Sequence, residues 1–232
     1  MATAAKCLTA PLHPEPQTGS NAPMLDLFIS TFATLFVVID PVGCAPIFAG
    51  LTAGYTPVHA RATALRASLI ATVILIVFAL FGKALLAALH IELNAFRIAG
   101  GLMLFLIALE MVFEKRTQRR EERVEKVKHT PEPHEDISVF PMAMPMLAGP
   151  GSIATVMLMM GHATDRTSSL VVLAALASVL VLSLLALLAA HPLMNLLGSR
   201  VEAVVTRVLG VLLGALAVQY VIDGVRGSIL GI

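Results

Sequence analysis

The sequence has few charged residues and only two cysteines. Charged residues make up 13% of its 232 positions, well below the ordinary fraction of a soluble protein, and the formal net charge is +1. This balance argues against a nucleic-acid partner, which needs clustered basic surface. Cys7 lies in a polar stretch and Cys44 in an apolar run, so we predict no disulfide between them. A hydrophobic fraction of 57% instead indicates an integral membrane protein, whose main partner is the lipid bilayer.

Several apolar runs are long enough to cross a bilayer, which takes about 20 helical residues each. They leave little room for a soluble domain, so we predict an all-α membrane protein with six transmembrane helices. The N-terminal stretch 1–23 lacks the apolar core of a secretory signal, and we predict a disordered tail there. The six predicted spans cover residues 25–51, 65–89, 94–113, 137–160, 169–190 and 203–222.

Basic residues predict the orientation of these spans, because Lys and Arg are retained on the cytoplasmic side during insertion. Most of them lie in the central loop, 114–136, or in the connections that share its side of the membrane. We therefore predict a cytoplasmic central loop and both termini outside. His129, Glu132 and His134 in this loop have no diagnostic metal-ligand spacing, so we predict a solvated loop without a metal.

Helix-breaking residues interrupt two of the spans near their centres. The interruptions are 40–46, which begins with Asp40-Pro41, and 141–152, which contains Gly149-Pro150-Gly151-Ser152. A carboxylate or irregular backbone at membrane depth is tolerated only inside protein or beside a water-filled cavity. Paired broken helices are typical of transporters that bind their substrate near the midplane.

The two halves of the chain, 24–113 and 137–232, resemble each other. Residues 97–106 align with 207–216, which matches Arg97 with Arg207 and Gly100 with Gly210 at a separation of 110 residues. Each half is then a broken helix followed by two continuous helices. Because three spans are an odd number, the halves enter the membrane from opposite sides and form an inverted repeat. The alternative is a chance match among common apolar residues.

The interruptions have a chemistry that suits a zwitterion. Asp40 is a natural N-cap with proline at the first helical position. Pro46 would clash with the carbonyl of Val42 in a regular helix, so we favour an unwound or tightened turn from Asp40 to Pro46. The amides near Gly151 would bind a carboxylate, while Asp40 would take an ammonium group, a proton or sodium. The alternative is that the breakers only kink the helices for tight packing.

Polar residues near these interruptions have two interpretations each. Thr34 and Thr155 could face the same cavity or bond their own backbone, and we favour backbone bonding for Thr34. Arg97 and Arg207 begin equivalent helices, where they would reach lipid headgroups or pair with an acid such as Glu92 or Glu202.

At the two interruptions the chain resembles the MarC family (UPF0056) of bacterial inner-membrane proteins. The family has an Asn-or-Asp-Pro-x-Gly-x-x-Pro-x-Phe stretch, matched by 40–48, and a Pro-x-x-x-Gly-Pro-Gly-x-Ile stretch, matched by 145–153. The resemblance implies an inner-membrane location and transport of small neutral amino acids such as glycine and alanine. The family also allows Asn where this chain has Asp40, and the N-terminal tail has no counterpart in it.

We therefore expect a secondary transporter of small neutral amino acids that works by alternating access, coupled to protons or sodium through Asp40. It is not expected to be an enzyme, because no nucleophile with its base is visible, or to need a cofactor. The alternatives are a structural or regulatory membrane protein and, less favoured, an intramembrane enzyme; a homo-oligomer is compatible with the sequence. The predicted substrate site comprises Asp40, Pro41, Gly43, Pro46, Gly149, Pro150, Gly151, Ser152 and Thr155.

Overall fold

A computed structural model describes residues 22–113, 136–163 and 165–230, and all secondary structure in these ranges is helical. The predicted tail 1–23 and central loop 114–136 lie outside them, apart from the first two residues of α1 and Asp136. Five helical segments are long and apolar enough to span a membrane, and a bent pair supplies a sixth. The helices are α1 (Ala22–Ile39), α2 (Pro41–Leu51), α3 (Pro57–Ala88), α4 (Leu93–Val112), η1 (Ser138–Leu147), α6 (Pro150–His162), α7 (Arg166–Leu188) and α8 (Ala190–Leu230).

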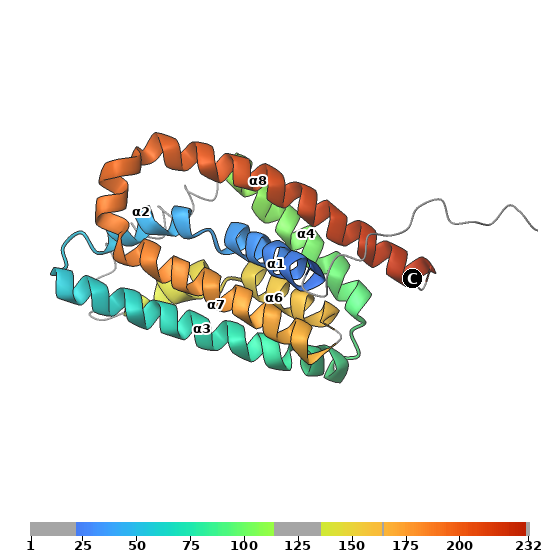
Figure 1. The fold of residues 1–232 in the computed structure, drawn as a ribbon. Helices are drawn as coiled ribbons and strands as arrows, with labels where there is room; N and C mark the ends of the chain where they lie inside the picture. The colour runs from blue at the N-terminus through green and yellow to red at the C-terminus, as the bar shows by residue number, and fades with distance from the viewer. Residues whose placement is uncertain (1–21, 114–135, 164, 231–232) are drawn as a thin grey trace, which may run out of the picture.

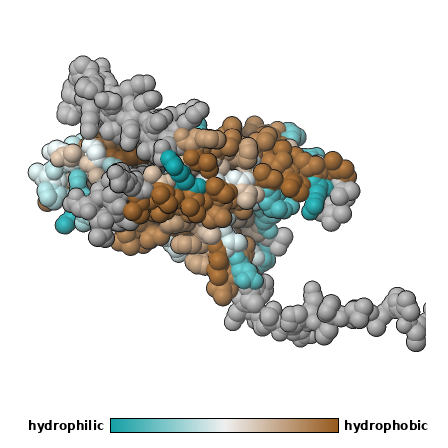
Figure 2. All heavy atoms as spheres, turned by 90° about the horizontal axis from the view of Figure 1, so that it is seen from above, coloured by the Kyte–Doolittle hydropathy of each residue, from teal (hydrophilic) through white to brown (hydrophobic). Residues whose placement is uncertain are grey.

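The helices form an elongated bundle with the second half of α1 and much of α6 buried in its interior (Figure 1). The window of α1 and α2 that qualifies as a span is 56% buried, whereas those of α3, α4 and α8 are 28% buried. Hydrophobic residues cover much of the outer surface in the view of Figure 2. This distribution is expected of a bundle whose outer helices face lipid and whose broken helices are shielded by protein.

Helices α4 and α8 pack tightly along their length because glycines face backbone across the interface. A Cβ added to Gly101 would lie 2.8 Å from the carbonyl oxygen of Ala217, and one added to Gly210 would lie 3.2 Å from that of Ala108. Close backbone approach through small residues is a common way for membrane helices to associate. The contacts pair the start of α4 with the end of α8, so the two helices are antiparallel.

The first interruption is a single residue. Asp40 has a left-handed backbone (φ 56°, ψ 65°), and regular α-helix resumes at Pro41 with Pro46 inside it. The predicted unwound turn from Asp40 to Pro46 is therefore wrong, whereas the predicted N-cap at Asp40 is confirmed. The left-handed backbone of Asp40 changes the direction of the chain in one residue. Pro46 then lies inside the new helix α2, where it only removes one backbone hydrogen bond.

The second interruption is longer. Phe140 and Met144 leave helical geometry inside η1, and α6 starts at Pro150 after the N-cap Gly149, as predicted. The axes of η1 and α6 differ by 51°, so together they make one bent span. The two interrupted spans therefore have different local geometry, a single left-handed residue in one and an irregular segment before a new helix in the other.

The predicted spans 169–190 and 203–222 agree with the apolar segments Arg166–Leu188 and Ala203–Ile229. The connection between them is itself helical, because α8 is continuous helix from Ala190 to Leu230 and follows α7 directly. Pro192 is compatible with this start, because the first helical residues have no intrahelical acceptor for their N–H groups. The beginning of α8 curves around the end of the bundle in Figure 1 before the helix runs back beside α4.

Candidate functional site

The two interruptions meet inside the bundle. A Cβ added to Gly151 at the start of α6 would lie 3.5 Å from Cγ1 of Val38, which is two residues before Asp40. The same added atom would lie 2.5 Å from Cδ1 of Ile107 and 3.7 Å from Cδ2 of Leu104, both on α4. Gly151 in the fourth span thus packs beside the last turn of α1, which ends just before Asp40, and α4 packs against the same point.

Asp40 is completely buried and caps α2. Its Oδ1 accepts a hydrogen bond of 3.0 Å from the amide of Gly43. The helical bonding continues through it, because the Asp40 amide donates to Phe36 and the Asp40 carbonyl accepts from Cys44. A buried carboxylate held in the left-handed region is an unusual element of a membrane helix, and such groups concentrate at functional sites.

The start of α6 offers backbone donors without a side-chain cap. Gly149 is the N-cap and makes no side-chain hydrogen bond, and the first intrahelical bond runs from the Ile153 amide to the Gly149 carbonyl. The amides of Gly151 and Ser152 precede that bond. The side chains of Asp40, Thr56 and Asp165 cap α2, α3 and α7, whereas α4 and α6 have no side-chain cap at their positive ends.

Most predicted site residues are buried, with two exceptions. Pro46 is half-buried on the outer side of α2, and Pro150 is exposed, so these prolines shape the backbone at the edge of the site. Thr34 and Thr155 donate to the carbonyls of Ser30 and Gly151, each over 2.8 Å, which confirms the predicted backbone bonding of Thr34. The buried members are Asp40, Pro41, Gly43, Gly149, Gly151, Ser152 and Thr155.

A second set of polar contacts joins α1, α6 and α8. The hydroxyls of Thr31 and Tyr220 lie 3.7 Å and 4.0 Å from the sulfur of Met159. Sequence analysis did not single out Tyr220 or Thr31 as partners of Met159, because the three residues come from α1, α6 and α8 and no local pattern joins them.

Sequence analysis also missed a polar cluster near the end of α6. The Arg97 guanidinium contacts Nε2 of His162, whose Nδ1 lies 2.8 Å from the carbonyl of Leu158, and Lys83 donates to the carbonyl of Ala163 over 3.0 Å. We expected Arg97 to reach lipid headgroups or pair with an acid, and the structure instead places it against His162. The cluster ties α3, α4 and α6 together on one side of the interruptions.

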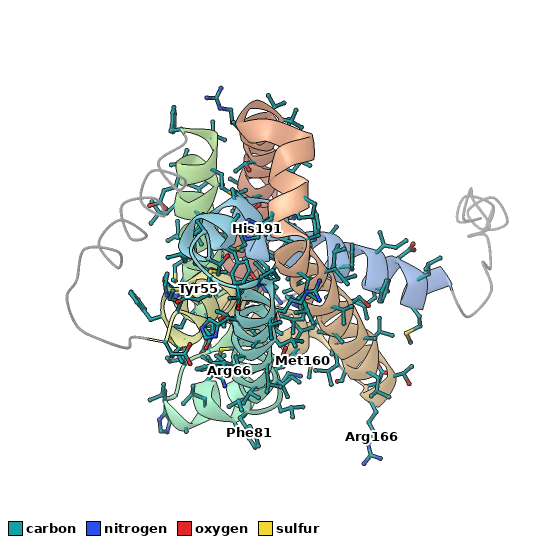
Figure 3. The ribbon with its side chains drawn as sticks, turned by 90° about the vertical axis from the view of Figure 1, so that its left-hand side faces the viewer. Tyr55, Arg66, Phe81, Met160, Arg166 and His191 are labelled. Atoms are coloured by element: carbon teal, nitrogen blue, oxygen red, sulfur yellow. The ribbon has the colours of Figure 1, made fainter. Side chains whose placement is uncertain are left out.

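On the other side, a polar cavity of about 390 Å³ opens between the start of α3 and the residues before η1. Arg66 lies 3.8 Å from Asp136 there, and hydrogen bonds from Ser138, with the Arg66 charge nearby, hold the pKa of Asp136 below its ordinary value. Thr52 and His191 approach within 3.4 Å at the same end. Tyr55, Arg66 and His191 are labelled in Figure 3, which views this end of the bundle. The cavity lining is Tyr55, His59, Ala62, Thr63, Arg66, Asp136 and Ile137.

Comparison with known proteins gives consistent matches over the helical part of the chain. A family model described as "MarC family integral membrane protein" matches residues 25–229. The UPF0056 membrane protein MJ1677 of Methanocaldococcus jannaschii is 36% identical, with 89% of this chain and 99% of the relative aligned. The UPF0056 membrane protein YvbG of Bacillus subtilis is 32% identical over 88% and 96% of the two chains.

The names of these two relatives give a membrane location and no substrate. No solved structure matches the chain. The family match covers both interruptions and every helix described above, so the chain belongs to the MarC family of integral membrane proteins.

Proposed function

We propose that this protein is a secondary transporter of small neutral amino acids, coupled to protons or sodium and working by alternating access. The observation that carries the proposal is the meeting of the two interruptions, where Gly151 at the start of α6 packs beside Val38 and the buried Asp40 caps the next helix. Broken helices that meet inside a bundle supply backbone groups and helix ends to a ligand at membrane depth.

The chemistry of the two ends fits a zwitterion. The uncapped start of α6 suits a carboxylate, because its first amides have no intrahelical acceptor and the helix dipole is positive there. Asp40 suits the ammonium group or a coupling cation. Gly149, Gly151 and Ala148 add little side-chain bulk and let backbone approach a ligand closely once the helices move apart, which favours glycine or alanine as substrate.

The described conformation is closed around this site. Asp40, Ser152 and Thr155 are 0%, 3% and 0% exposed, so a ligand reaches them only after helices move apart. Polar contacts lie towards both ends, Arg66 with Asp136 on one side and Arg97 with His162 on the other. Opening one set while the other stays closed is what alternating access requires.

An inverted repeat would provide the two alternating states, and the arrangement of the helices agrees with it. Each half has a broken span followed by two long helices, and the aligned helices α4 and α8 are antiparallel. We place the protein in the bacterial inner membrane, with the central loop in the cytoplasm and both termini outside, because of its Lys and Arg distribution.

The test is uptake of labelled glycine and alanine into proteoliposomes, with an imposed proton or sodium gradient. We expect Gly151→Ala to reduce gradient-driven uptake, because the added methyl occupies space between the start of α6, Val38 and Ile107. Ile107→Val removes Cδ1, the nearest atom to that methyl, so the double variant separates packing strain from a blocked site. Gly50→Ala is the matched control, since nothing lies within 4 Å of its added Cβ.

The expected outcome is full uptake by Gly50→Ala and a defect in Gly151→Ala that persists when Ile107→Val relieves the clash. Wild-type protein that is folded in the vesicles and takes up neither amino acid under either gradient would refute the amino acid proposal.

A further inference from the structure

An apolar groove lies between α3 and α7 on the outside of the bundle. It has a volume of about 430 Å³, and its lining residues recur every three or four positions on each helix, so one face of α3 opposes one face of α7. The two helices run side by side in Figure 1. Leu65, Leu69 and Val181 at the groove are more than half exposed. The lining is Leu65, Arg66, Ser68, Leu69, Thr72, Ala177, Leu180, Val181 and Leu184.

Ser68 is the polar group in this lining that lacks a partner. Its side chain is buried, with the residue 6% exposed, and its Oγ makes no hydrogen bond within the described chain. Thr72, one turn further, is satisfied, because its hydroxyl donates to the Ser68 carbonyl over 2.7 Å. A buried hydroxyl without a partner is costly, so Ser68 points to an acceptor that comes from outside the described protein.

Arg66 places a positive charge at the same groove. Its guanidinium is 69% exposed and lies 3.8 Å from Asp136, which is a loose and solvated ion pair. Arg66 also lines the polar cavity with Tyr55 and His59, so it stands where an apolar groove meets a polar cavity. A guanidinium has five donors in a planar fork that fits a phosphate, and one weak pair leaves several of them available.

We propose that the α3–α7 groove binds one anionic phospholipid, with an acyl chain along the leucines, an ester carbonyl accepting from Ser68 and the phosphate at Arg66. An amphipathic ligand of this kind has an anionic, a hydrogen-bond-accepting and an apolar part, which match Arg66, Ser68 and the leucines of the groove. Anionic headgroups favour basic residues near the membrane surface, which gives the site its selectivity. The proposal does not rest on which substrate is transported, because none of the groove residues belongs to the site at the interruptions; Arg66 also makes the contact with Asp136 at one end of the bundle.

The chain contains no tryptophan, so a single introduced tryptophan reports nearby brominated acyl chains by quenching of its fluorescence. Leu69→Trp places the reporter on the groove, and Val181→Trp is a second groove position. Leu182→Trp is the control, because Leu182 is exposed on α7 but does not line the groove. Each variant is reconstituted in vesicles that contain brominated phosphatidylglycerol or brominated phosphatidylcholine with identical acyl chains.

We expect the groove reporters to prefer phosphatidylglycerol over phosphatidylcholine by about fivefold, as one basic residue near the membrane surface provides, and the control to show no preference. Arg66→Gln should abolish the preference and Ser68→Ala should weaken quenching by both lipids. Arg61→Gln removes an exposed charge on the same helix outside the groove, and it should leave the preference for phosphatidylglycerol unchanged. Ala177→Phe, which fills the groove, should reduce quenching at the groove only.

Equal quenching by the two headgroups at Leu69→Trp and Val181→Trp would overturn the proposal and leave ordinary annular lipid. An equal effect of Arg61→Gln and Arg66→Gln would also overturn it, because the preference would then come from the charge of the whole surface. Groove reporters that no lipid quenches, beside a control that is quenched, would show that a second copy of the chain covers the groove.

Discussion

Asp40 combines two structural roles that substitution can separate. Its left-handed backbone, with φ at 56°, disfavours residues with a Cβ other than Asp and Asn, and its Oδ1 satisfies the Gly43 amide over 3.0 Å. Asp40→Asn keeps both properties and removes only the charge. Asp40→Gly keeps the backbone conformation and loses the cap, whereas Asp40→Ala loses the cap and strains the backbone as well.

These differences give an ordered series of stabilities. Losing an N-cap costs ~1 kcal/mol, and a left-handed alanine costs ~1–2 kcal/mol. We therefore expect Asp40→Ala to lose ~2–3 kcal/mol of unfolding free energy, Asp40→Gly ~1 kcal/mol, and Asp40→Asn to remain at or above the wild-type value, since it buries no charge. Reversible unfolding of the purified protein in mixed micelles would measure the series.

Transport by Asp40→Asn then tests the charge separately from the fold. If Asp40 binds the coupling ion, the variant is stable but fails to accumulate substrate against its gradient. Retained accumulation would assign Asp40 to capping alone. The structural reasoning itself is refuted if Asp40→Asn is as unstable as Asp40→Ala, because a cap and a left-handed residue should tolerate the amide.

Three further predictions test the packing, the electrostatics and the orientation. Gly101→Ala should destabilise the α4–α8 interface by ~1–3 kcal/mol in micelle unfolding, whereas Gly214→Ala, whose added Cβ makes only a 3.6 Å contact, should be tolerated. Hydrogen bonds from Ser168 hold the pKa of Asp165 below its ordinary value, so its stabilising contribution should be lost as pH falls through that lowered pKa, and thermal unfolding of Asp165→Asn should lack this loss. In a background without native cysteines, an impermeant thiol reagent should label Arg166→Cys from outside and Gly54→Cys only from the cytoplasmic side; labelling of both from one side would refute the topology.

Local chemistry explains why the helix starts were predictable. Asp40-Pro41 and Gly149-Pro150 each place proline at the first helical position, where no N–H is needed, and both helices begin there. The predicted unwound or tightened turn at Pro46 is wrong, because the rule that proline breaks a helix considers the proline alone and not the residues before it. A left-handed Asp40 already changes the chain direction, and α2 then continues past Pro46 with one hydrogen bond fewer.

The start of α8 shows a different limit of the sequence. Apolar length predicts which residues lie at membrane depth, but it does not say where a helix ends. Residues 191–202 are more polar than the spans on either side, yet they are helical, because Pro192 falls in the first turn and helix propensity does not require an apolar face.

Contacts between distant helices could not be predicted from the sequence. Arg97 and His162 come from α4 and α6, whereas the expected partners of the arginine were lipid headgroups or an acid such as Glu92. A neutral imidazole that donates through Nδ1 to the Leu158 carbonyl can accept from a guanidinium N–H at Nε2, which gives the arginine a partner without an acid, while Arg97 Nε stays buried without a hydrogen bond in the described part of the chain. This contact depends on how α4 and α6 pack against each other, and no residue spacing along the sequence predicts it.

The kinds of contact in the bundle indicate which parts can move. The interface of α4 and α8 brings glycine against backbone, as at Gly101 with Ala217, and backbone atoms cannot yield by rotation. Helix α6 instead meets its neighbours through side-chain atoms, such as those of Met157 against Gly82 and Leu158 against Gly100. Rotamer changes are cheaper than backbone shifts, so we expect α4 and α8 to stay together while α6 moves against them. That motion would open the buried start of α6, which is where the proposed substrate binds.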